Sequence, residues 1–333
     1  MSEPLVSVII PLYNAEEYIE QAVRSVLAQS LPEVEVVVVD DHSTDGSLQR
    51  VQALAAEDSR VRWLQTPANG GPGRARNRGM EAARGAWISM LDADDWYDVE
   101  RLQQLLDAAR QLGLAIAADN QRFITDATGG HQALLTPADV PSPQRLGVED
   151  YLEGDRIHRT SRNLGLLKPM IRRDLLQQHG IRYDDERRRT IGEDFYFLLE
   201  CMSHAGGLAY VSRPMYNYRT YDPNMLTKQL DLESYHAWRE MHGRYEHLFD
   251  PGQQQQARAR RLMQQRGRDI EQHIQFRRVV EPLKRGRLGE FMRVTVTNPK
   301  SILLLLRNLL EDPAALLLTA RYLARSIRHR LGT

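Results

Sequence analysis

The sequence is poor in cysteine and in aromatic side chains, with one cysteine and 7% aromatic residues in a chain of 333. The single cysteine, Cys201, excludes an internal disulfide, and its apolar surroundings FYFLLECM predict a buried thiol. No run of about 18 apolar residues occurs, so no helix is expected to span a bilayer. The beginning of the chain, MSEPLVSVII, lacks the basic segment and cleavage site of a signal peptide. We therefore expect a cytoplasmic protein.

The chain also has no excess of positive or negative charge, because 44 Lys and Arg residues balance 44 Asp and Glu residues. From Pro251 onward, however, 17 Lys and Arg residues stand against 6 Asp and Glu residues, so the chain before it has an acidic excess. An enzyme of nucleic acids needs a basic track for the phosphates, and the acidic first part argues against a nucleic-acid partner. It suits a site that collects a divalent cation.

Strand and helix patterns alternate through the first hundred residues. Short runs of β-branched residues are separated by segments in which apolar residues recur with a helical period. This alternation predicts an α/β fold, in which a mostly parallel central sheet is flanked by helices and the ligand lies beyond the carboxyl ends of the strands. The expected strands are residues 6–10, 35–39, 61–64 and 87–91, with Pro11 ending the first, and the expected helices are 16–29, 43–54 and 74–84.

The pattern changes further along the chain. Residues 126–160 contain several glycines and prolines and are expected to form loops. A second patterned region follows, and from about Lys228 the sequence becomes mainly helical and basic. In the second patterned region we expect helices near 174–179 and over 193–202, and a strand or hairpin over 210–218.

Two of the predicted strands end in groups that can hold a nucleotide. The strand VSVIIPLYN brings Pro11, Tyr13 and Asn14 to its carboxyl end, where the aromatic ring could lie against a planar base. The strand in VVVVDDHSTDGS delivers Asp40 and Asp41, whose carboxylates can accept hydrogen bonds from a base or a ribose. The alternative is that one of these aspartates caps the next helix.

The glycine loop NGGPGRARNRG follows the third predicted strand. Its glycines, Gly70, Gly71 and Gly73, allow the backbone to approach a ligand closely. The helix that follows offers its N-terminus to phosphates, and Arg74 and Arg76 add positive charge. The loop fits neither of the common phosphate-binding glycine patterns, so it predicts a ligand contact only together with the other motifs.

Two acidic motifs complete the series. In ISMLDADDW, Asp92, Asp94 and Asp95 directly follow a buried strand, and clustered carboxylates require a cation or strong donors. Mg²⁺ or Mn²⁺ together with a substrate diphosphate is the natural partner, although a solvated acidic turn is the alternative. In TIGEDFYFLLE, Glu193 and Asp194 open an apolar helix. They either complement the helix dipole or supply a carboxylate base.

These five motifs, in this order, resemble those of the family-2 glycosyltransferases with the GT-A fold. The resemblance covers about residues 5–220 and extends to bacterial members that build exopolysaccharides. The residues that match the family pattern are Pro11, Tyr13 and Asn14; Asp40, Asp41, Ser43 and Asp45; Asn69, Gly71, Ala75, Arg76, Asn77 and Gly79; Leu91, Asp92, Asp94 and Asp95; and Glu193 with Asp194.

The resemblance implies the fold of the nucleotide-diphospho-sugar transferases and a site for a nucleotide-sugar donor. In that site Asp41 would contact the nucleobase, within a pocket formed by Pro11 and Tyr13. Asn14 and Gly71 would also belong to this substrate site. His42 departs from the small or polar residue common at its position, and we interpret it as a variable loop residue.

The resemblance also implies the chemistry of transfer. Asp92 would lie near the ribose, and Arg76 would belong to the same substrate site. Asp94 would bind the Mg²⁺ or Mn²⁺ that bridges the diphosphate. Asp194, beside Glu193, would deprotonate the acceptor hydroxyl, so that a hexose leaves its UDP carrier with inversion at the anomeric carbon.

The expected organisation is a GT-A domain over residues 1–228 and a basic helical region over 229–333. Within the first, residues 1–105 form the nucleotide-binding half and 106–228 the acceptor and catalytic half. Leucines such as Leu303 and Leu317 alternate with arginines and suggest amphipathic helices. These helices could lie on the inner face of the cell membrane, near a glycan or lipid-linked oligosaccharide acceptor. A packed appendage or a contact between copies of the chain is the alternative.

Other classes of protein fit the motifs less well. A nucleotidyltransferase would use the same metal and phosphates but needs an activating basic loop near the N-terminus, where Pro11 to Asn14 stand instead. A non-catalytic protein that only binds nucleotide sugars has no need to keep both Asp94 and Asp194. The hypothesis that explains all five motifs is a metal-dependent glycosyltransferase.

Overall fold

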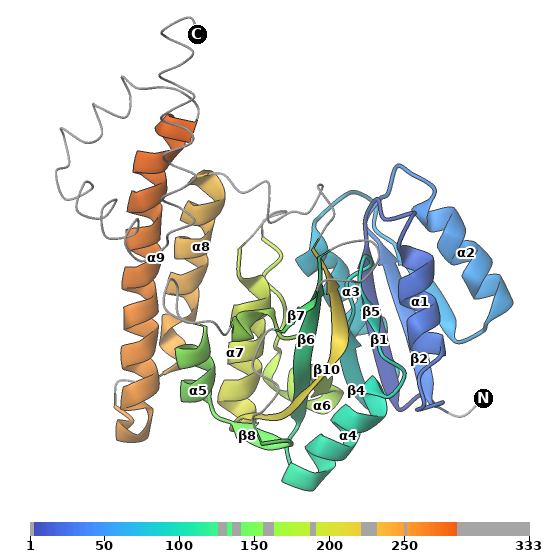
Figure 1. The fold of residues 1–333 in the computed structure, drawn as a ribbon, viewed down its shortest axis with the longest axis horizontal. Helices are drawn as coiled ribbons and strands as arrows, with labels where there is room; N and C mark the ends of the chain where they lie inside the picture. The colour runs from blue at the N-terminus through green and yellow to red at the C-terminus, as the bar shows by residue number, and fades with distance from the viewer. Residues whose placement is uncertain are drawn as a thin grey trace, which may run out of the picture.

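The computed structural model describes residues 3–125, 132–134, 141–155, 163–186, 191–220, 232–249 and 252–284. Its centre is one twisted sheet with helices on both faces (Figure 1). The strands lie in the order β3-β2-β1-β4-β9-β6-β10-β5, with β7 beside β6 and β8 beside β10. The predicted α/β class, with a central sheet flanked by helices, is confirmed.

The first half of the sheet is parallel, as the alternating sequence predicts. Strands β3, β2, β1 and β4 pair in parallel, and helices connect them. Their carboxyl ends therefore meet at one edge of the sheet. The elements are β1 (Val6–Leu12), α1 (Ile19–Leu27), β2 (Val34–Asp40), α2 (Ser47–Glu57), β3 (Val61–Gln65), α3 (Pro72–Ala82) and β4 (Trp87–Met90).

The first strand is longer than expected and runs through Pro11 to Leu12. Pro11 pairs with Val39 of β2, whereas the pairing of β1 with β4 stops at Ile9. The missing N–H of the proline therefore costs no hydrogen bond to β4, and an edge of this kind is where a sheet tolerates proline. The prediction that Pro11 ends the strand is wrong for this reason.

The second half of the sheet is mixed. Strand β9 is antiparallel to both β4 and β6, whereas β10 is parallel to β6 and antiparallel to β5. The elements are β5 (Trp96–Tyr97), α4 (Arg101–Leu112), β6 (Ile116–Ile124), β7 (Gln132–Leu134), β8 (Gln144–Leu146), α5 (Val148–Gly154), a 3₁₀ turn (Leu164–Leu166), β9 (Met170–Arg172), α6 (Arg173–His179), α7 (Glu193–Ala205) and β10 (Leu208–Arg219).

Part of the segment expected to be loop is ordered into elements. Helix α5 forms within residues 126–160 because Tyr151 and Leu152 are buried on one face, three and four residues after Val148. Strand β8 pairs with β10 at the edge of the sheet. The glycines and prolines of this segment therefore concealed three short elements, β7, β8 and α5.

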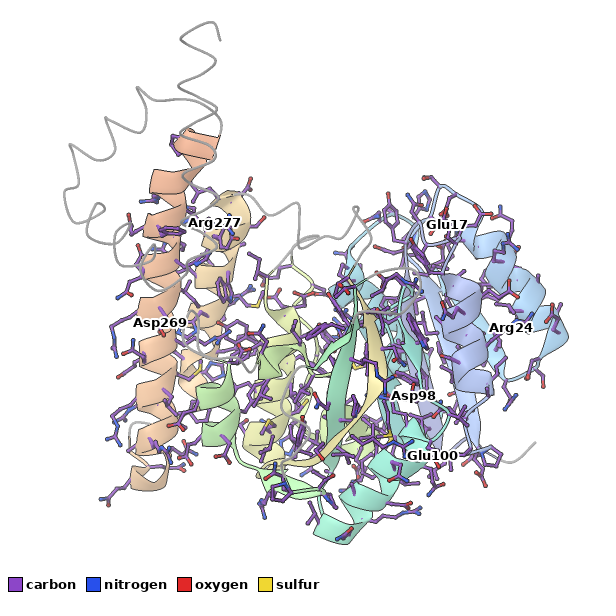
Figure 2. All side chains as sticks on the ribbon, viewed as in Figure 1. Glu17, Arg24, Asp98, Glu100, Asp269 and Arg277 are labelled. Carbon is purple, nitrogen blue, oxygen red and sulfur yellow. The ribbon has the colours of Figure 1, made fainter. Side chains whose placement is uncertain are left out.

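Each face of the sheet carries its own core. Along β2, Val36 and Val38 face the cluster under α1, α2 and α4, whereas Val37 and Val39 face the cluster under α3, α6 and α7. This is the period of two that a strand imposes on its side chains. Arg24 of α1, labelled in Figure 2, forms an ion pair with Glu57 at the end of α2, at 3.1 Å. Cys201, within α7, is fully buried, as predicted.

Two further helices, α8 (Leu232–Tyr245) and α9 (Ala257–Lys284), lie side by side at the end of the molecule away from α1 and α2 (Figure 1). Trp238 of α8 and Met263 of α9 join the same core cluster as α7. Arg277 of α9 reaches the ring of Tyr235 on α8, 4.9 Å from its centroid (Figure 2). The two helices are therefore packed onto the face of the sheet that carries α7.

No helix among the described residues is long and apolar enough to cross a membrane. The amphipathic helices that the sequence suggests around Leu303 and Leu317 lie outside the described residues.

Candidate active site

The acidic loop after β4 is held in place by the end of β10. Tyr216 donates a hydrogen bond to Asp95 at 2.7 Å and accepts one from the backbone N–H of Asp92 at 3.2 Å. The backbone N–H of Arg219 donates to the other oxygen of Asp95 at 2.8 Å, and its guanidinium donates to the carbonyl of Asp94 at 2.7 Å. Asp95 is only 2% exposed, so this loop is not the solvated acidic turn that the sequence left open.

Glu193 and Asp194 form the first turn of α7, and a glycine sets their direction. Gly192 precedes the helix with φ of 80°, a left-handed conformation that favours glycine. A Cβ atom at this position would lie 3.0 Å from the indole nitrogen of Trp238 on α8. The backbone turn therefore aims the two carboxylates toward the acidic loop while α8 closes the space behind them.

Two buried cations join the acidic loop to the start of α7. Arg76 of α3 reaches Asp92 at 2.9 Å, Asp194 at 3.3 Å and Glu193 at 3.4 Å. Lys168, which precedes β9, reaches Asp92 at 2.8 Å and Asp194 at 2.6 Å. Both cations are about 4% exposed. Residues from four separate segments of the chain thus meet in one charged cluster at the carboxyl edge of the sheet.

The pKa values follow this pairing. Burial raises the pKa of Asp92, but the charges of Lys168 and Arg76 outweigh it and hold that pKa below its usual range. Burial lowers the pKa of Lys168, yet Asp194 and Asp92 raise it well above its usual value. Burial, followed by the charge of Asp194, raises the pKa of Glu193. The lysine is therefore a fixed positive charge between the two aspartates.

Asp94 has a different electrostatic environment from Asp92. Burial and then the charge of Asp92 raise the pKa of Asp94 from 3.8 to about 6. In the described part of the chain, no side chain donates a hydrogen bond to its carboxylate. A carboxylate whose charged form is disfavoured in this way gains from a nearby cation. The position of Asp94 therefore fits a ligand of Mg²⁺ or Mn²⁺.

The described residues do not form a complete metal cage, since they contain no group of three or more His, Cys, Asp or Glu side chains arranged to hold an ion. A metal at Asp94 would need other oxygen ligands. Mg²⁺ is commonly held by one or two carboxylates together with substrate phosphates and water. The donor set present thus fits an ion that arrives with a diphosphate.

The loops after β1 and β2 lie next to each other at the same edge. Asn14, with φ of 49°, donates from its backbone N–H to Ser43 at 3.0 Å and accepts from the backbone N–H of Thr44 at 2.8 Å. Tyr13 is 44% exposed, so its ring is available to a ligand. The exposed ring lies where the sequence predicts a surface for the base.

Asp41 is buried and fixes the glycine loop. Its carboxylate accepts hydrogen bonds from the backbone N–H groups of Gly70 at 3.0 Å and Gly71 at 2.6 Å, and from the hydroxyl of Thr66 at 2.8 Å. Gly71 has φ of 90° and begins α3. Asp40 accepts hydrogen bonds from Ser43 and Gln65. Neither aspartate caps α2, which begins at Ser47.

The structure thus groups the predicted residues into two neighbouring sets. Asp92, Glu193, Asp194 and Arg76 are in ion-pair contact. The other set lies at the carboxyl ends of β1 and β2 and in the loop before α3, and contains Pro11, Tyr13, Asn14, Asp41 and Gly71.

Sequence reasoning missed Lys168 as a site residue. It lies in the apolar segment LGLLKPMI, and a lone lysine in such a segment must be paired if it is buried. That signal could have singled it out, although it would not have named the partners. Tyr216 and Arg219 were also missed, because their partners lie more than a hundred residues earlier in the chain.

Comparisons with known proteins support the motif-based resemblance. A family model described as glycosyl transferase family 2 matches residues 7–176. The succinoglycan biosynthesis protein ExoO of Rhizobium meliloti is 35% identical over 206 residues, which cover 62% of this chain and 58% of ExoO. An uncharacterized glycosyltransferase of Haemophilus influenzae is 31% identical over 202 residues, covering 61% of this chain and 73% of that protein. The chain therefore spans little more than half the length of ExoO.

The fold is similar to that of solved structures. S. aureus TarS 1–349, crystallised in complex with UDP, superposes with a TM-score of 0.63 at 21% sequence identity, covering 98% of this chain and 92% of that chain. At this level of identity the likeness establishes the GT-A-like fold, with its mixed sheet and C-terminal helices. The match to the family model ends before Glu193 and Asp194, so their part in the site depends on the geometry described above.

Proposed function

We propose, from the premise that this chain belongs to glycosyl transferase family 2, that it transfers a sugar from a nucleoside-diphosphate sugar to an acceptor hydroxyl. One observation carries this proposal. The acidic loop at Asp92 and Asp94 and the carboxylate pair at the start of α7 meet around Arg76 and Lys168. A donor-binding carboxylate and a base carboxylate then lie on the two sides of one site, as sugar transfer requires.

On the donor side, we propose that the nucleobase lies against Tyr13 beside Pro11, close to the loop that Asp41 holds. Gly71 and Asn14 shape the same surface through their left-handed backbone conformations. TarS was crystallised with UDP and with UDP-GlcNAc, which favours a UDP-sugar, and among these a UDP-hexose, as the donor to test first. We propose that Asp92, held by two cations, contacts the ribose.

Asp94 is the residue that we propose for the metal. Mg²⁺ or Mn²⁺ bound there would stabilise the negative charge that develops on the departing nucleoside diphosphate. The carboxylate supplies one oxygen ligand from the protein. Arg219 and Tyr216 hold the loop that carries it, so the ligand is presented at a fixed place on the sheet edge.

For the chemical step we propose Asp194 as the general base. Its carboxylate would take the proton from the acceptor hydroxyl, whose oxygen then attacks the anomeric carbon opposite the leaving diphosphate. A single in-line displacement of this kind inverts the configuration at that carbon. Glu193, whose pKa is raised by burial, is the alternative base. The variants Asp194→Asn and Glu193→Gln, described below, distinguish the two candidates.

The acceptor that we propose is a glycan or a lipid-linked oligosaccharide of a bacterial surface polysaccharide. The relative ExoO is a succinoglycan biosynthesis protein, and EpsJ of Bacillus subtilis, 30% identical over 233 residues, is an uncharacterized glycosyltransferase. A cytoplasmic location, at the inner face of the membrane, would give the enzyme both a nucleotide-sugar donor and such an acceptor.

The first experiment is calorimetric binding of UDP, GDP, dTDP and ADP with Mn²⁺ or Mg²⁺, repeated with EDTA. We expect one nucleotide, UDP by preference, to bind tightly and only with metal. Release of that nucleotide from its sugar donors is then measured with alkyl glycosides as acceptors. Binding of none of the four would contradict the donor site, and binding without turnover would favour a non-catalytic nucleotide-sugar binding protein.

A further inference from the structure

Lys168 is a buried cation that bridges the two sides of the site. It lies between the 3₁₀ turn at Leu164–Leu166 and strand β9, and only 4% of its surface is exposed. Its Nζ atom is 2.8 Å from Oδ2 of Asp92 and 2.6 Å from Oδ2 of Asp194. A single ammonium group therefore contacts both the carboxylate assigned to the donor and the carboxylate assigned to the acceptor.

The charges of the cluster make this lysine necessary. Arg76 and Lys168 contribute two positive charges against the three carboxylates of Asp92, Glu193 and Asp194. Loss of one cation would leave the three carboxylates with a single positively charged partner. This is strongly unfavourable, because a buried charge would then be uncompensated. The cluster would then relax by moving a carboxylate toward solvent or by protonating one.

The two aspartates do not depend on Lys168 equally. Asp92 accepts a hydrogen bond from Arg76 at 2.9 Å through its other oxygen, so it keeps a partner without the lysine. Oδ1 of Asp194 is buried and has no hydrogen-bond partner, although Nη1 of Arg76 is 3.3 Å away. Among the described residues, Lys168 is thus the one side chain that donates a hydrogen bond to Asp194.

We infer that Lys168 is a positioning residue for the transfer reaction, which holds the Asp194 carboxylate in its productive place and links it to the donor carboxylate Asp92. This inference rests on the proposed function. Because Asp194 loses its hydrogen bond and Asp92 does not lose both of its partners, removal of Lys168 should impair turnover more than donor binding. A residue that only stabilised the fold would not separate these two quantities.

The test compares Lys168→Met, Lys168→Gln and Lys168→Arg with the wild-type chain. Donor affinity is measured by calorimetry with UDP and Mn²⁺, and kcat by release of UDP from its sugar donor with alkyl glycoside acceptors. We expect Lys168→Met to lower kcat about 10-fold or more while the Kd for UDP changes less than about 3-fold. Lys168→Arg keeps the charge and should recover part of the lost kcat.

Arg62→Met is the matched control, because Arg62 forms an ion pair of the same 2.8 Å length with Glu35 near the start of strands β2 and β3. We expect it to leave both kcat and Kd unchanged. If Lys168→Met does not fold, Lys168→Gln takes its place, because the shorter amide side chain removes the charge but keeps a polar group in the buried cluster. Circular dichroism and thermal unfolding show which variants are folded.

Several outcomes would overturn the inference. Wild-type kcat in a folded Lys168→Met chain would show that Asp194 needs no such support, and wild-type kcat in a folded Lys168→Gln chain would show that it needs no positive charge beside it. Equal losses of kcat and of UDP affinity would assign the lysine to the donor side or to the fold alone. Failure of the proposed function would appear differently, as a wild-type chain without nucleotide binding or turnover.

Discussion

Asp194, the proposed base, lies in the first turn of α7 in contact with Lys168 and Arg76. Its replacement by Asn keeps the shape and removes the negative charge. We expect Asp194→Asn to lower kcat by about 10²-fold or more while metal-dependent donor binding stays largely intact. Nucleotide release and calorimetry check the two quantities.

Glu193→Gln is the matched variant, since Glu193 lies in the same turn and also contacts Arg76. It should retain much more activity than Asp194→Asn. Full transferase activity in Asp194→Asn would show that the base assignment is wrong, and a reversed order of the two variants would give the role to Glu193.

Asp94 is expected to lower the stability of the folded chain near neutral pH when no metal is bound. Its pKa in the folded chain, about 6, lies above the ordinary 3.8, so the folded state binds the proton more tightly than the unfolded state. The stabilisation from this group is therefore present at low pH and is lost as the pH rises through about 6. Without metal, Asp94→Asn should raise the free energy of unfolding near neutral pH by about 1–3 kcal/mol.

Thermal unfolding in EDTA checks this expectation, and the gain should fade as the pH is lowered toward about 4. In the presence of Mn²⁺ the same variant should bind UDP more weakly than the wild type. A variant that bound UDP and metal as tightly as the wild type would remove Asp94 from the metal site.

The site residues that could be predicted from the sequence are those that belong to a recognisable local pattern. Asp92, Asp94, Glu193 and Asp194 all stand next to a predicted strand or helix, so their types and places could be read together. Lys168 has no such pattern, because its role depends on two carboxylates 76 residues before it and 26 residues after it. A long-range ion pair leaves no mark on the local sequence beyond an unexpected charge in an apolar run.

At the scale of elements, the turn into α7 determines where the two carboxylates point. Gly192→Ala introduces a Cβ at φ of 80° and 3.0 Å from the Trp238 indole nitrogen. We expect it to destabilise the chain by about 1–3 kcal/mol and to lower kcat, because the first turn of α7 must shift. Chemical denaturation and the nucleotide-release assay measure both effects.

Gly113→Ala provides the matched control. Gly113 ends α4 with φ of 63°, and no atom lies within 4 Å of the added Cβ. The backbone strain is of the same kind, but α4 carries none of the site carboxylates. Its stability should fall while kcat stays at the wild-type value, and a parallel loss of kcat would mean that general destabilisation explains both variants.

The alternating elements of the first half could be predicted because each strand and helix has its own local period. The second half could not be ordered in the same way, since β9 enters the sheet between β4 and β6 from a distant part of the chain. Short elements such as α5 and β8 have too few residues to show a period. Their existence depends on burial against α7, α9 and β10, which only the folded chain provides.

At the scale of the whole molecule, a buried arginine of α9 contacts helix α7. Arg266 lies over the ring of Phe195, 3.5 Å from its centroid, and its guanidinium contacts the Asp155 carboxylate at 2.8 Å. Phe195 directly follows Asp194 in the chain. The C-terminal helices therefore support the helix that carries the proposed base.

A chain that ends at residue 228, the boundary expected for the first domain, would lose α8 and α9. We expect it to unfold at least about 10 °C lower than the full chain or to aggregate, because the apolar face of α7 loses its cover. Thermal unfolding by circular dichroism measures the difference. A chain that ends after Lys284 keeps both helices and is the control, and an unchanged unfolding temperature at 228 would show an independent domain.

The order of charges along the chain has a consequence for synthesis on the ribosome. Arg76 is translated before Asp92, and Lys168 before Asp194, so each aspartate of the cluster emerges after a cation that will hold it. At about 5–20 residues per second, the 102 residues from Asp92 to Asp194 take roughly 5–20 s to appear. The nascent chain can thus pair Asp92 with Arg76 before the proposed base, Asp194, has been synthesised.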